Sequence, residues 1–158
     1  AIANAKKYIY IQTPYFLPTE GLNQALLIAA LGGIDVRLML PKRSDTRSAN
    51  MGTHSFIDEM VKAGVKVYFY EPGFLHSKLM IIDDALACIG SANMDFRSFE
   101  HNFEINAFVY QPSFAIQMKR VFMHDMHSCE RLIPSRWLKR PIKQRLAESF
   151  MRLFSPLL

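Results

Sequence analysis

Four residues with a regular spacing form the most chemically distinctive pattern in this sequence. His76, Lys78, Asp83 and Asn93 stand in the order His-x-Lys-x4-Asp-x6-Gly-Ser-x-Asn. On a strand, residues two apart project to the same face, so the imidazole of His76 and the ammonium of Lys78 are expected to address one phosphate together. The run Leu-Met-Ile-Ile follows Lys78. Polar groups beside such a buried strand are costly unless they are paired, which indicates a site.

These residue types predict phosphodiester exchange. A neutral imidazole attacks phosphorus and forms a phosphohistidine, which divides one displacement into two. Lys78 and the amide of Asn93 are expected to stabilise the non-bridging oxygens, whose charge grows in the transition state. A second imidazole must protonate the leaving alkoxide and later deprotonate the incoming alcohol. Neither a metal nor a cofactor is needed, and no metal-ligand spacing is present.

Each of these residues also has an ordinary structural role. A single histidine is commonly a surface or core residue, a lysine a solvated charge, and an asparagine a turn or cap. Asp83, followed by Asp84, fits a hairpin turn. It lies about 13 Å beyond Lys78 at roughly 3.3 Å per strand residue, so we expect it to be structural. We group Asp83 and Ser91 as supporting residues, and only the combined pattern is specific for a site.

The order of expected elements predicts an α/β sandwich, a mixed β-sheet flanked by helices. β-Branched and aromatic runs predict strands at 6–13, 34–40, 65–70, 78–83, 86–89 and 104–110. Apolar residues at helical spacing predict helices at 22–30, 56–64 and 113–128. The polar residues 42–52 are expected to form a loop near a functional edge.

Length and composition fit one folded domain. The chain has 158 residues, of which 50% are hydrophobic, and a net charge of +5 that favours anionic partners. Its two cysteines fit no metal spacing. It has no apolar run near the roughly 18 residues of a membrane span. It does not begin with Met and enters a strand almost at once, so we expect a fragment of a longer protein.

The last part of the chain differs in character from the rest. We divide the chain into a catalytic domain, residues 1–136, and a basic amphipathic tail of the same domain, residues 137–158. After Pro141, apolar residues recur at helical spacing among several lysines and arginines: Ile142, Leu146, Phe150 and Leu153. A basic helix of this kind can lie in a membrane interface. The alternative is a surface helix that packs on its own domain.

The motif resembles that of the phospholipase D superfamily, the HKD motif. The flanking segments resemble the C-terminal half of bacterial cardiolipin synthases: 10–16 (Tyr-Ile-Gln-Thr-Pro-Tyr-Phe), 70–76, 90–98, 102–104 (Asn-Phe-Glu) and 153–158. The resemblance covers nearly the whole chain, without departure at the motif positions. Family members carry two such motifs and N-terminal membrane segments, whereas this chain has one motif.

The resemblance implies roles for particular residues. His76 is then one of two catalytic imidazoles, and Lys78 and Asn93 contact the phosphate. A carboxylate in this superfamily accepts a hydrogen bond from the motif histidine and fixes its tautomer. Glu104 is the candidate for that role, with a surface salt bridge as the alternative. Arg97 and Ser98 are expected to anchor the loop rather than to touch substrate.

The resemblance also implies a reaction and a setting. The function expected is the phosphatidyltransferase half-site of a cardiolipin synthase, which makes cardiolipin and glycerol from two phosphatidylglycerol molecules. Expected partners are anionic phospholipid, a membrane surface and the N-terminal half of the parent protein, with self-pairing of this half as the other route to a complete site. The parent is expected at the cell membrane, and no nucleic acid is expected. Two alternatives remain: a homodimeric phosphodiesterase acting on nucleic acid, and a non-catalytic half that binds anionic phospholipid.

Overall fold

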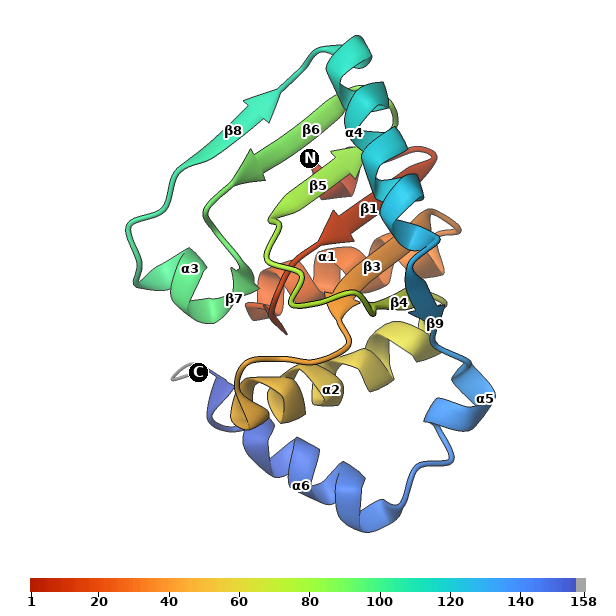
Figure 1. The fold of residues 1–158 in the computed structure, drawn as a ribbon, viewed down its shortest axis with the longest axis vertical. Coiled ribbons are helices and arrows are strands. Elements are labelled where there is room, and N and C mark those ends of the chain that lie inside the picture. Colours follow the sequence, from red (N-terminus) through yellow and green to blue (C-terminus); the bar gives the residue numbers. More distant parts are fainter. Residues whose placement is uncertain (156–158) are drawn as a thin grey trace.

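A seven-stranded mixed β-sheet forms the centre of the computed structural model, which describes residues 1–155 (Figure 1). The strand order is β8-β6-β5-β1-β3-β4-β9, and β2 pairs separately with β7. The strands are β1 Tyr8–Gln12, β2 Phe16–Leu17, β3 Asp35–Pro41, β4 Lys66–Tyr70, β5 Leu79–Ile82, β6 Leu86–Gly90, β7 Met94–Asp95, β8 Asn106–Val109 and β9 Cys129–Arg131. The last three residues of the predicted tail, 156–158, lie outside the described range.

Helices cover both faces of the sheet. They are the 3-10 turn η1 Ile2–Asn4 and α1 Glu20–Leu31, α2 Arg47–Lys62, α3 Phe96–Glu100, α4 Pro112–Met126, α5 Pro134–Trp137 and α6 Ile142–Arg152. In β1, Ile9 and Ile11 face the core shared with α1 and α2, whereas Tyr8 and Tyr10 face the core shared with α4. This alternation follows from the two-residue period of a strand and explains why β1 is buried along its length.

The strand pairing makes the sheet mixed, which confirms the predicted fold class. β1, β3 and β4 are parallel to one another, with helices in the crossovers. β5, β6 and β8 follow as antiparallel neighbours, and β5 pairs with β1, also antiparallel. The motif residues flank two of these neighbouring strands: His76 and Lys78 precede β5, Asp83 follows it, and Asn93 follows β6.

The polar segment 42–52 was predicted as a loop, and this prediction is wrong for its second half. Helix α2 begins at Arg47, four turns before Lys62. The buried positions of its first half carry small residues, Ala49, Gly52 and Thr53, rather than large apolar ones. Thr53 Oγ1 accepts a hydrogen bond from the backbone N–H of Phe16 in β2, at 3.2 Å. The apolar periodicity was weak because close packing here requires small side chains.

His76 and Lys78 were predicted to lie on a strand, and the structure corrects this. Both precede β5, which begins at Leu79. Leu79 is paired with Gln12, the last residue of β1, so no β1 residue remains to pair with 76–78. On the other side, the Gly90 N–H donates to the Lys78 carbonyl at 3.3 Å. The strand rule for same-face projection therefore does not apply to this pair.

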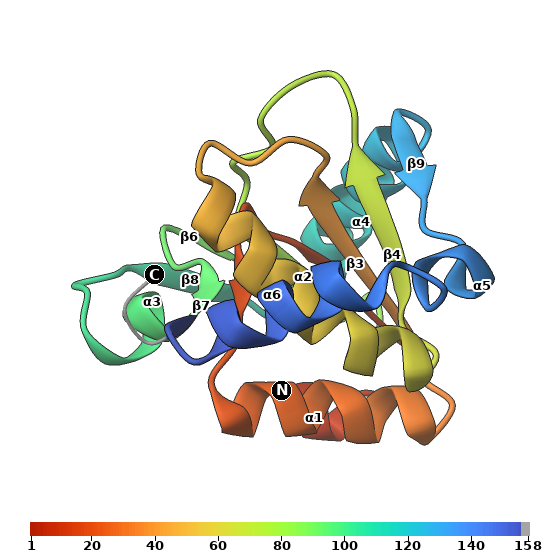
Figure 2. The same ribbon diagram turned by 90° about the horizontal axis from the view of Figure 1, so that it is seen from below.

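Helix α6 forms in the tail where the spacing of apolar residues predicted a helix, and it lies along α2 (Figures 1 and 2). It packs through its polar side: Glu148, only 3% exposed, accepts hydrogen bonds from Arg140 and Gln144. The apolar residues of the tail point the other way and are 59–74% exposed: Ile142, Leu146, Phe150 and Leu153. None of the helices within residues 1–155 combines the length and the apolar character that crossing a bilayer requires.

Candidate active site

The segment that carries His76 and Lys78 is coil and lies directly before β5, at one end of the sheet. The His76 ring is exposed, and its centroid lies 5.5 Å from that of Phe74. Lys78 is partly buried and its Nζ donates to the His76 carbonyl oxygen at 2.9 Å. Burial lowers the pKa of Lys78, while the charges of Glu104 and Asp95 act in the opposite direction. The ammonium group therefore lies within electrostatic reach of the elements that follow β6.

The end of β6 is tied to the start of β8 by Ser91. Its backbone N–H donates to the Ile105 carbonyl at 3.0 Å, and its Oγ accepts from the Ile105 N–H at 3.0 Å. The Ser91 hydroxyl also donates to the Glu104 carboxylate. Gly90, the residue before it, allows the two strands to approach closely. Ser91 therefore supports the site by fixing where Glu104 stands.

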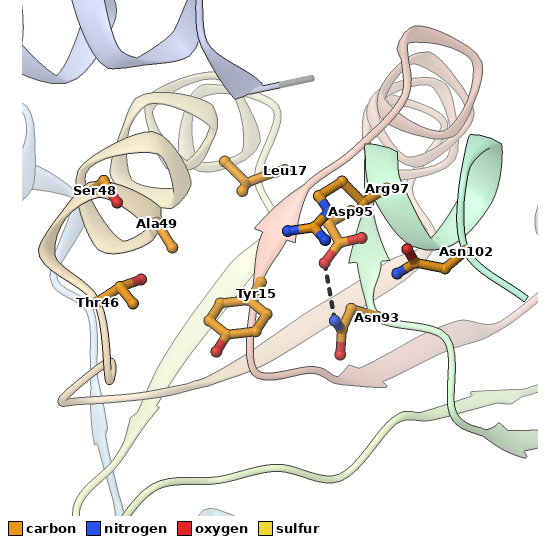
Figure 3. Close-up of a pocket in the computed structure, with 9 residues that line it drawn as sticks. All are labelled: Tyr15, Leu17, Thr46, Ser48, Ala49, Asn93, Asp95, Arg97 and Asn102. Carbon is orange, nitrogen blue, oxygen red and sulfur yellow. Dashed lines mark hydrogen bonds between the residues drawn. The ribbon is translucent and has the colours of Figure 1, made fainter. Parts of the chain in front are cut away.

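Asn93 lies in the turn between β6 and β7. Its backbone N–H donates to Ser98 Oγ at 3.1 Å, and its Nδ2 donates to Asp95 at 2.9 Å (Figure 3). Its Oδ1 is buried and has no hydrogen-bond partner within residues 1–155. A buried acceptor without a donor is costly, and the other such side-chain atom within residues 1–155 is Asn23 Oδ1 in α1. The amide is thus oriented by Asp95, to which its Nδ2 donates.

Glu104 was predicted to bind the His76 imidazole, and the structure shows no such hydrogen bond. Its carboxylate instead accepts from Ser91, Ser98 and Asn102. These hydrogen bonds, led by that of Ser91, lower the pKa of Glu104. The reason is positional: Glu104 stands two residues before β8, His76 stands three residues before β5, and β6 lies between these two strands.

Two buried polar residues in the site were missed or undervalued by the sequence reasoning. Asp95 is 5% exposed and caps α3 by accepting from the Ser98 N–H at 2.7 Å. Ser98 is 6% exposed, and its hydroxyl donates to Glu104 at 3.1 Å, which bears out its expected anchoring role. Aspartate is a preferred N-cap residue, and this preference could have identified the Asp95 cap. Together they connect Asn93 to Glu104.

Asp83 stands at the opposite end of β5 from His76. It occupies the turn into β6 with a φ of 56°, and its carboxylate accepts from the N–H groups of Lys6, Lys7 and Tyr8 at 2.6, 2.8 and 2.8 Å. Burial alone would raise the pKa of Asp83, but these backbone hydrogen bonds together lower it. The geometry gives Asp83 a scaffold role, in which it fastens the start of β1.

Replacing Asp83 with asparagine should lower the free energy of unfolding by about 1–3 kcal/mol at neutral pH, because charged acceptors bind backbone N–H groups more strongly. Asparagine tolerates the left-handed backbone, so the change removes mainly the charge. The pKa of Asp83 is lowered in the folded state, so the charge stabilises above the unfolded pKa of about 3.9 and this stabilisation is lost as pH falls. Urea unfolding of both proteins at neutral and acidic pH measures this. A difference that does not shrink in acid would contradict it.

A cavity of about 400 Å3 opens beside Asn93. Its wall on one side consists of the start of α2, and on the other of β7, α3 and the turns around them (Figure 3). The lining residues are Tyr15, Leu17, Thr46, Ser48, Ala49, Asn93, Asp95, Arg97 and Asn102. A second cavity of about 380 Å3 reaches Lys78 and is lined mainly by apolar residues, among them Leu22, Leu79, Met80, Phe99 and Phe108. The motif thus lies between a polar and an apolar cavity.

Within the described part of the chain, no cluster of three or more His, Cys, Asp or Glu residues has the arrangement of a metal site. The motif supplies an exposed imidazole, a partly buried ammonium and an amide for chemistry. Each is suited to a phosphate ester: the imidazole to attack or proton transfer, and the other two to binding.

Comparison with known proteins relates this geometry to a family. Residues 1–126 match the sequence profile of the family described as "Cardiolipin synthase, PLD-like domain". The chain is 46% identical over 157 residues to the cardiolipin synthase of Geobacillus kaustophilus and 44% identical over 157 residues to the major cardiolipin synthase of Bacillus subtilis. These alignments cover 99% of this chain but 31% and 33% of the relatives, so the chain spans about a third of their length. The match lies in their C-terminal half.

Solved structures share the fold. Nuc, a phospholipase D family member from Salmonella typhimurium, has a TM-score of 0.71 at 22% identity, with 84% of this chain and 86% of that chain covered. The phosphatidylserine synthase of Haemophilus influenzae has a TM-score of 0.72 at 16% identity, with 99% and 43% covered. The similarity to these structures supports the fold alone, whereas the profile covers most of the sequence. The chain belongs to the cardiolipin synthase family of phospholipase-D-like domains.

Proposed function

We propose that this chain is the C-terminal catalytic half of a cardiolipin synthase. The complete site would transfer a phosphatidyl group from one phosphatidylglycerol to a hydroxyl of another and release glycerol. Family membership supports this reaction, and so does the motif at the edge of the sheet. The main support for a lipid substrate is the apolar cavity beside Lys78, because the phosphate of a phospholipid is attached to an apolar body that such a cavity can hold.

The reaction would proceed in two displacements. One imidazole attacks phosphorus, the bond to the leaving glycerol oxygen breaks, and the second imidazole gives that oxygen its proton. The acceptor hydroxyl then attacks phosphorus, the P–N bond breaks, and its proton passes to the second imidazole. His76 supplies one of the two imidazoles, and we assign it the acid–base role. Lys78 and Asn93 bind the non-bridging oxygens.

The second imidazole would come from the N-terminal half of the parent protein, facing this one. Pairing of two copies of this chain is the alternative source, since a two-fold axis also brings two motifs together. We propose that Glu104 orients His76 in the paired site, after a movement of the exposed coil that carries the imidazole. Without a partner half, this chain is expected to be inactive.

A phosphodiesterase acting on nucleic acid is the alternative that shares the same site. The two functions are separated by giving the full-length protein labelled phosphatidylglycerol in mixed micelles, or labelled single-stranded DNA, and resolving the products. Our proposal predicts cardiolipin and an equal amount of glycerol from the lipid, and no cleavage of the DNA. Cleaved DNA without cardiolipin would support the alternative. Neither product, with the lipid still bound, would support a non-catalytic half.

The proposal includes a membrane surface as a partner, which α6 would contact. Its apolar stripe, from Ile142 to Leu153, faces solvent, and the exposed Lys139 and Lys143 can meet anionic headgroups. Replacing Leu146 and Phe150 with serine should lower the partition of the chain onto phosphatidylglycerol vesicles by about a hundredfold, since each loses a buried apolar side chain. Co-sedimentation with vesicles measures this.

The matched control replaces Ile28 and Leu31, which are 68% and 72% exposed on α1, with serine. These changes remove similar apolar area from a helix outside the basic tail, so the partition should stay near that of the unmodified chain. Equal losses for the two pairs, or no loss for either, would contradict contact through α6.

A further inference from the structure

A buried glutamine stands at the end of β1, next to the coil that carries His76. Gln12 is the last residue of β1 and is only 1% exposed, although an amide is costly to bury unless its polar atoms are hydrogen-bonded. Helix α4, which packs across β1 and β5 (Figure 1), supplies one partner: the Gln12 Nε2 donates to the Asp125 carboxylate at 2.9 Å. None of the roles that the reaction gives to the motif residues requires this buried amide.

The Asp125 carboxylate determines which way the Gln12 amide points. An ionised carboxylate only accepts hydrogen bonds, so the amide turns its nitrogen toward Asp125 and its oxygen away. That oxygen, Oε1, accepts a hydrogen bond from the Ser77 hydroxyl at 3.1 Å. The same nitrogen also lies 3.2 Å from the sulfur of Met39, a buried residue of β3. The amide is therefore bound at both ends, between α4 and the coil before β5.

Ser77 stands between His76 and Lys78, the two motif residues of this coil. Leu75, on the other side of His76, is buried in the core that α4 shares with the sheet. Both neighbours of His76 are thus held on the α4 side, one by burial and the other by Gln12. The imidazole itself is exposed, and its side chain forms no hydrogen bond with residues 1–155. Its position therefore depends on the anchors of its two neighbours.

Lys78 is placed by other contacts. Its carbonyl accepts from the Gly90 N–H at 3.3 Å, and Leu79, the next residue, begins β5. Loss of the hydrogen bond between Gln12 and Ser77 would therefore loosen the chain at His76 more than at Lys78. The group that transfers a proton and the group that binds phosphate thus depend on different parts of the fold.

We propose that Gln12 and Ser77 are positioning residues, whose hydrogen bond holds the coil so that the His76 imidazole meets the leaving glycerol oxygen. This assignment rests on the proposed function, in which His76 has the acid–base role. In the first displacement the P–N bond to the other imidazole forms, the P–O bond to glycerol breaks, and His76 gives its proton to the departing oxygen. Proton transfer requires hydrogen-bond reach, so a displacement of about 1 Å can cost about a hundredfold in rate.

The test compares two leaving groups in the full-length protein. Glycerol leaves phosphatidylglycerol as a basic alkoxide that needs a proton, whereas p-nitrophenolate leaves phosphatidyl-p-nitrophenol without one. Ser77→Ala is expected to lower kcat for cardiolipin synthesis about tenfold or more, with KM for phosphatidylglycerol near the wild-type value. The first-turnover burst of p-nitrophenolate should stay within about twofold of the wild type, because this step needs no general acid.

A purely structural role for this hydrogen bond predicts a different pattern. A protein that is only less stable would lose both reactions to the same extent. Equal losses in Ser77→Ala would therefore overturn the proposal, and so would wild-type rates with both substrates. Ser77→Thr keeps the hydroxyl and should keep most of the wild-type rate of cardiolipin synthesis.

His76→Ala, measured with the same two substrates, separates failure of this proposal from failure of the proposed function. It should lose cardiolipin synthesis and keep the burst of p-nitrophenolate. If His76→Ala keeps the burst and Ser77→Ala loses it, the positioning role alone is wrong. If His76→Ala loses the burst, the acid–base role of His76 is refuted, and the positioning role with it. A wild-type protein that makes no cardiolipin would refute the proposed function itself.

Gln12→Met tests the other partner of the hydrogen bond. Methionine is unbranched and similar in length, so the change removes the amide while nearly keeping the buried volume. It should show the same selective loss as Ser77→Ala. Because the two changes break one hydrogen bond, the double variant should lose no more than the more affected single variant. Losses that multiply in the double variant would overturn the proposal. Ser77→Ala decides the matter alone if Gln12→Met does not fold.

Gln24→Met is the matched control for Gln12→Met. Gln24 is exposed on α1, and its Nε2 also donates to a carboxylate, that of Glu20, at 2.8 Å. The control therefore removes the same kind of hydrogen bond at a site that does not contact the coil of His76. Both reactions should stay at the wild-type rate. A selective loss of cardiolipin synthesis in Gln24→Met would overturn the specific role given to Gln12.

Discussion

Replacing His76 with alanine in the full-length protein is expected to lower cardiolipin synthesis at least about a thousandfold. The imidazole is the motif group that is suited to transfer a proton or to attack phosphorus. Without it the leaving glycerol oxygen or the incoming hydroxyl must exchange its proton with water. Lys78 and Asn93 would still bind the phosphate, so the loss should fall on kcat rather than on KM for phosphatidylglycerol. Thin-layer separation of labelled lipid products measures the rate.

His127→Ala is the matched control for this prediction. His127 is an exposed residue at the end of α4, and its ring contacts only the His124 carbonyl, at 3.3 Å, among the hydrogen bonds of residues 1–155. Its removal should leave the rate near that of the wild type. The account would be wrong if His76→Ala retained more than a small fraction of the wild-type rate while remaining folded.

Replacing Gly90 with alanine is expected to be the most destabilising small substitution in the site. A Cβ at this position would lie 2.7 Å from Asn106 Cα, and closer still to the Ile105 carbonyl and the Asn106 amide oxygen. Two of these neighbours are backbone, and the hydrogen bonds between Ser91 and Ile105 hold β6 against β8. The strands must therefore separate, at a cost of about 3 kcal/mol or more. The separation would also displace Glu104 and lower activity.

Gly21→Ala is the control, because a Cβ there meets nothing within 4 Å and the residue lies in α1. Alanine should raise the free energy of unfolding by about 0.5–1 kcal/mol through helix propensity. Urea midpoints of the two variants should thus move in opposite directions from the wild type. A Gly90→Ala protein as stable as the wild type would show that β6 and β8 are not held as closely as described.

The central strands were predictable because they are largely buried on both faces and therefore appear in the sequence as nearly continuous apolar runs. The segments 34–40 and 65–70 became β3 and β4 with shifts of one residue at their ends. The start of α2 was not predictable in the same way. Its buried positions carry the small residues Ala49 and Gly52. Because these residues are only weakly hydrophobic, the sequence shows no clear helical period of apolar residues here.

The residues of the candidate site could be proposed from the sequence, but their geometry could not. The spacing of the motif identified His76, Lys78 and Asn93, yet these residues stand in coil and turns, where strand rules do not place side chains. The Glu104 contacts depend on β6 lying between β8 and β5, which is a property of the topology and not of local sequence.

In the tail, the sequence predicted the helix but not the face through which it packs. Its apolar period predicted α6, but the period alone favours packing through the apolar face. The structure packs the helix through Glu148, which lies 3% exposed near Arg140 and His54. A polar face can serve as the packing face when it meets polar partners, which here are Arg140 and, from α2, His54.

The measurement that tests the central claim most directly is a single-turnover reaction of the full-length protein with phosphatidylglycerol labelled in its phosphate. The account predicts a protein-bound label that is stable to alkali and released by acid, as a P–N bond is. Added unlabelled phosphatidylglycerol should chase this label into cardiolipin in the wild type but not in His76→Ala. Cardiolipin formed without any protein-bound label, or an equally fast chase in His76→Ala, would contradict a two-step transfer that depends on His76.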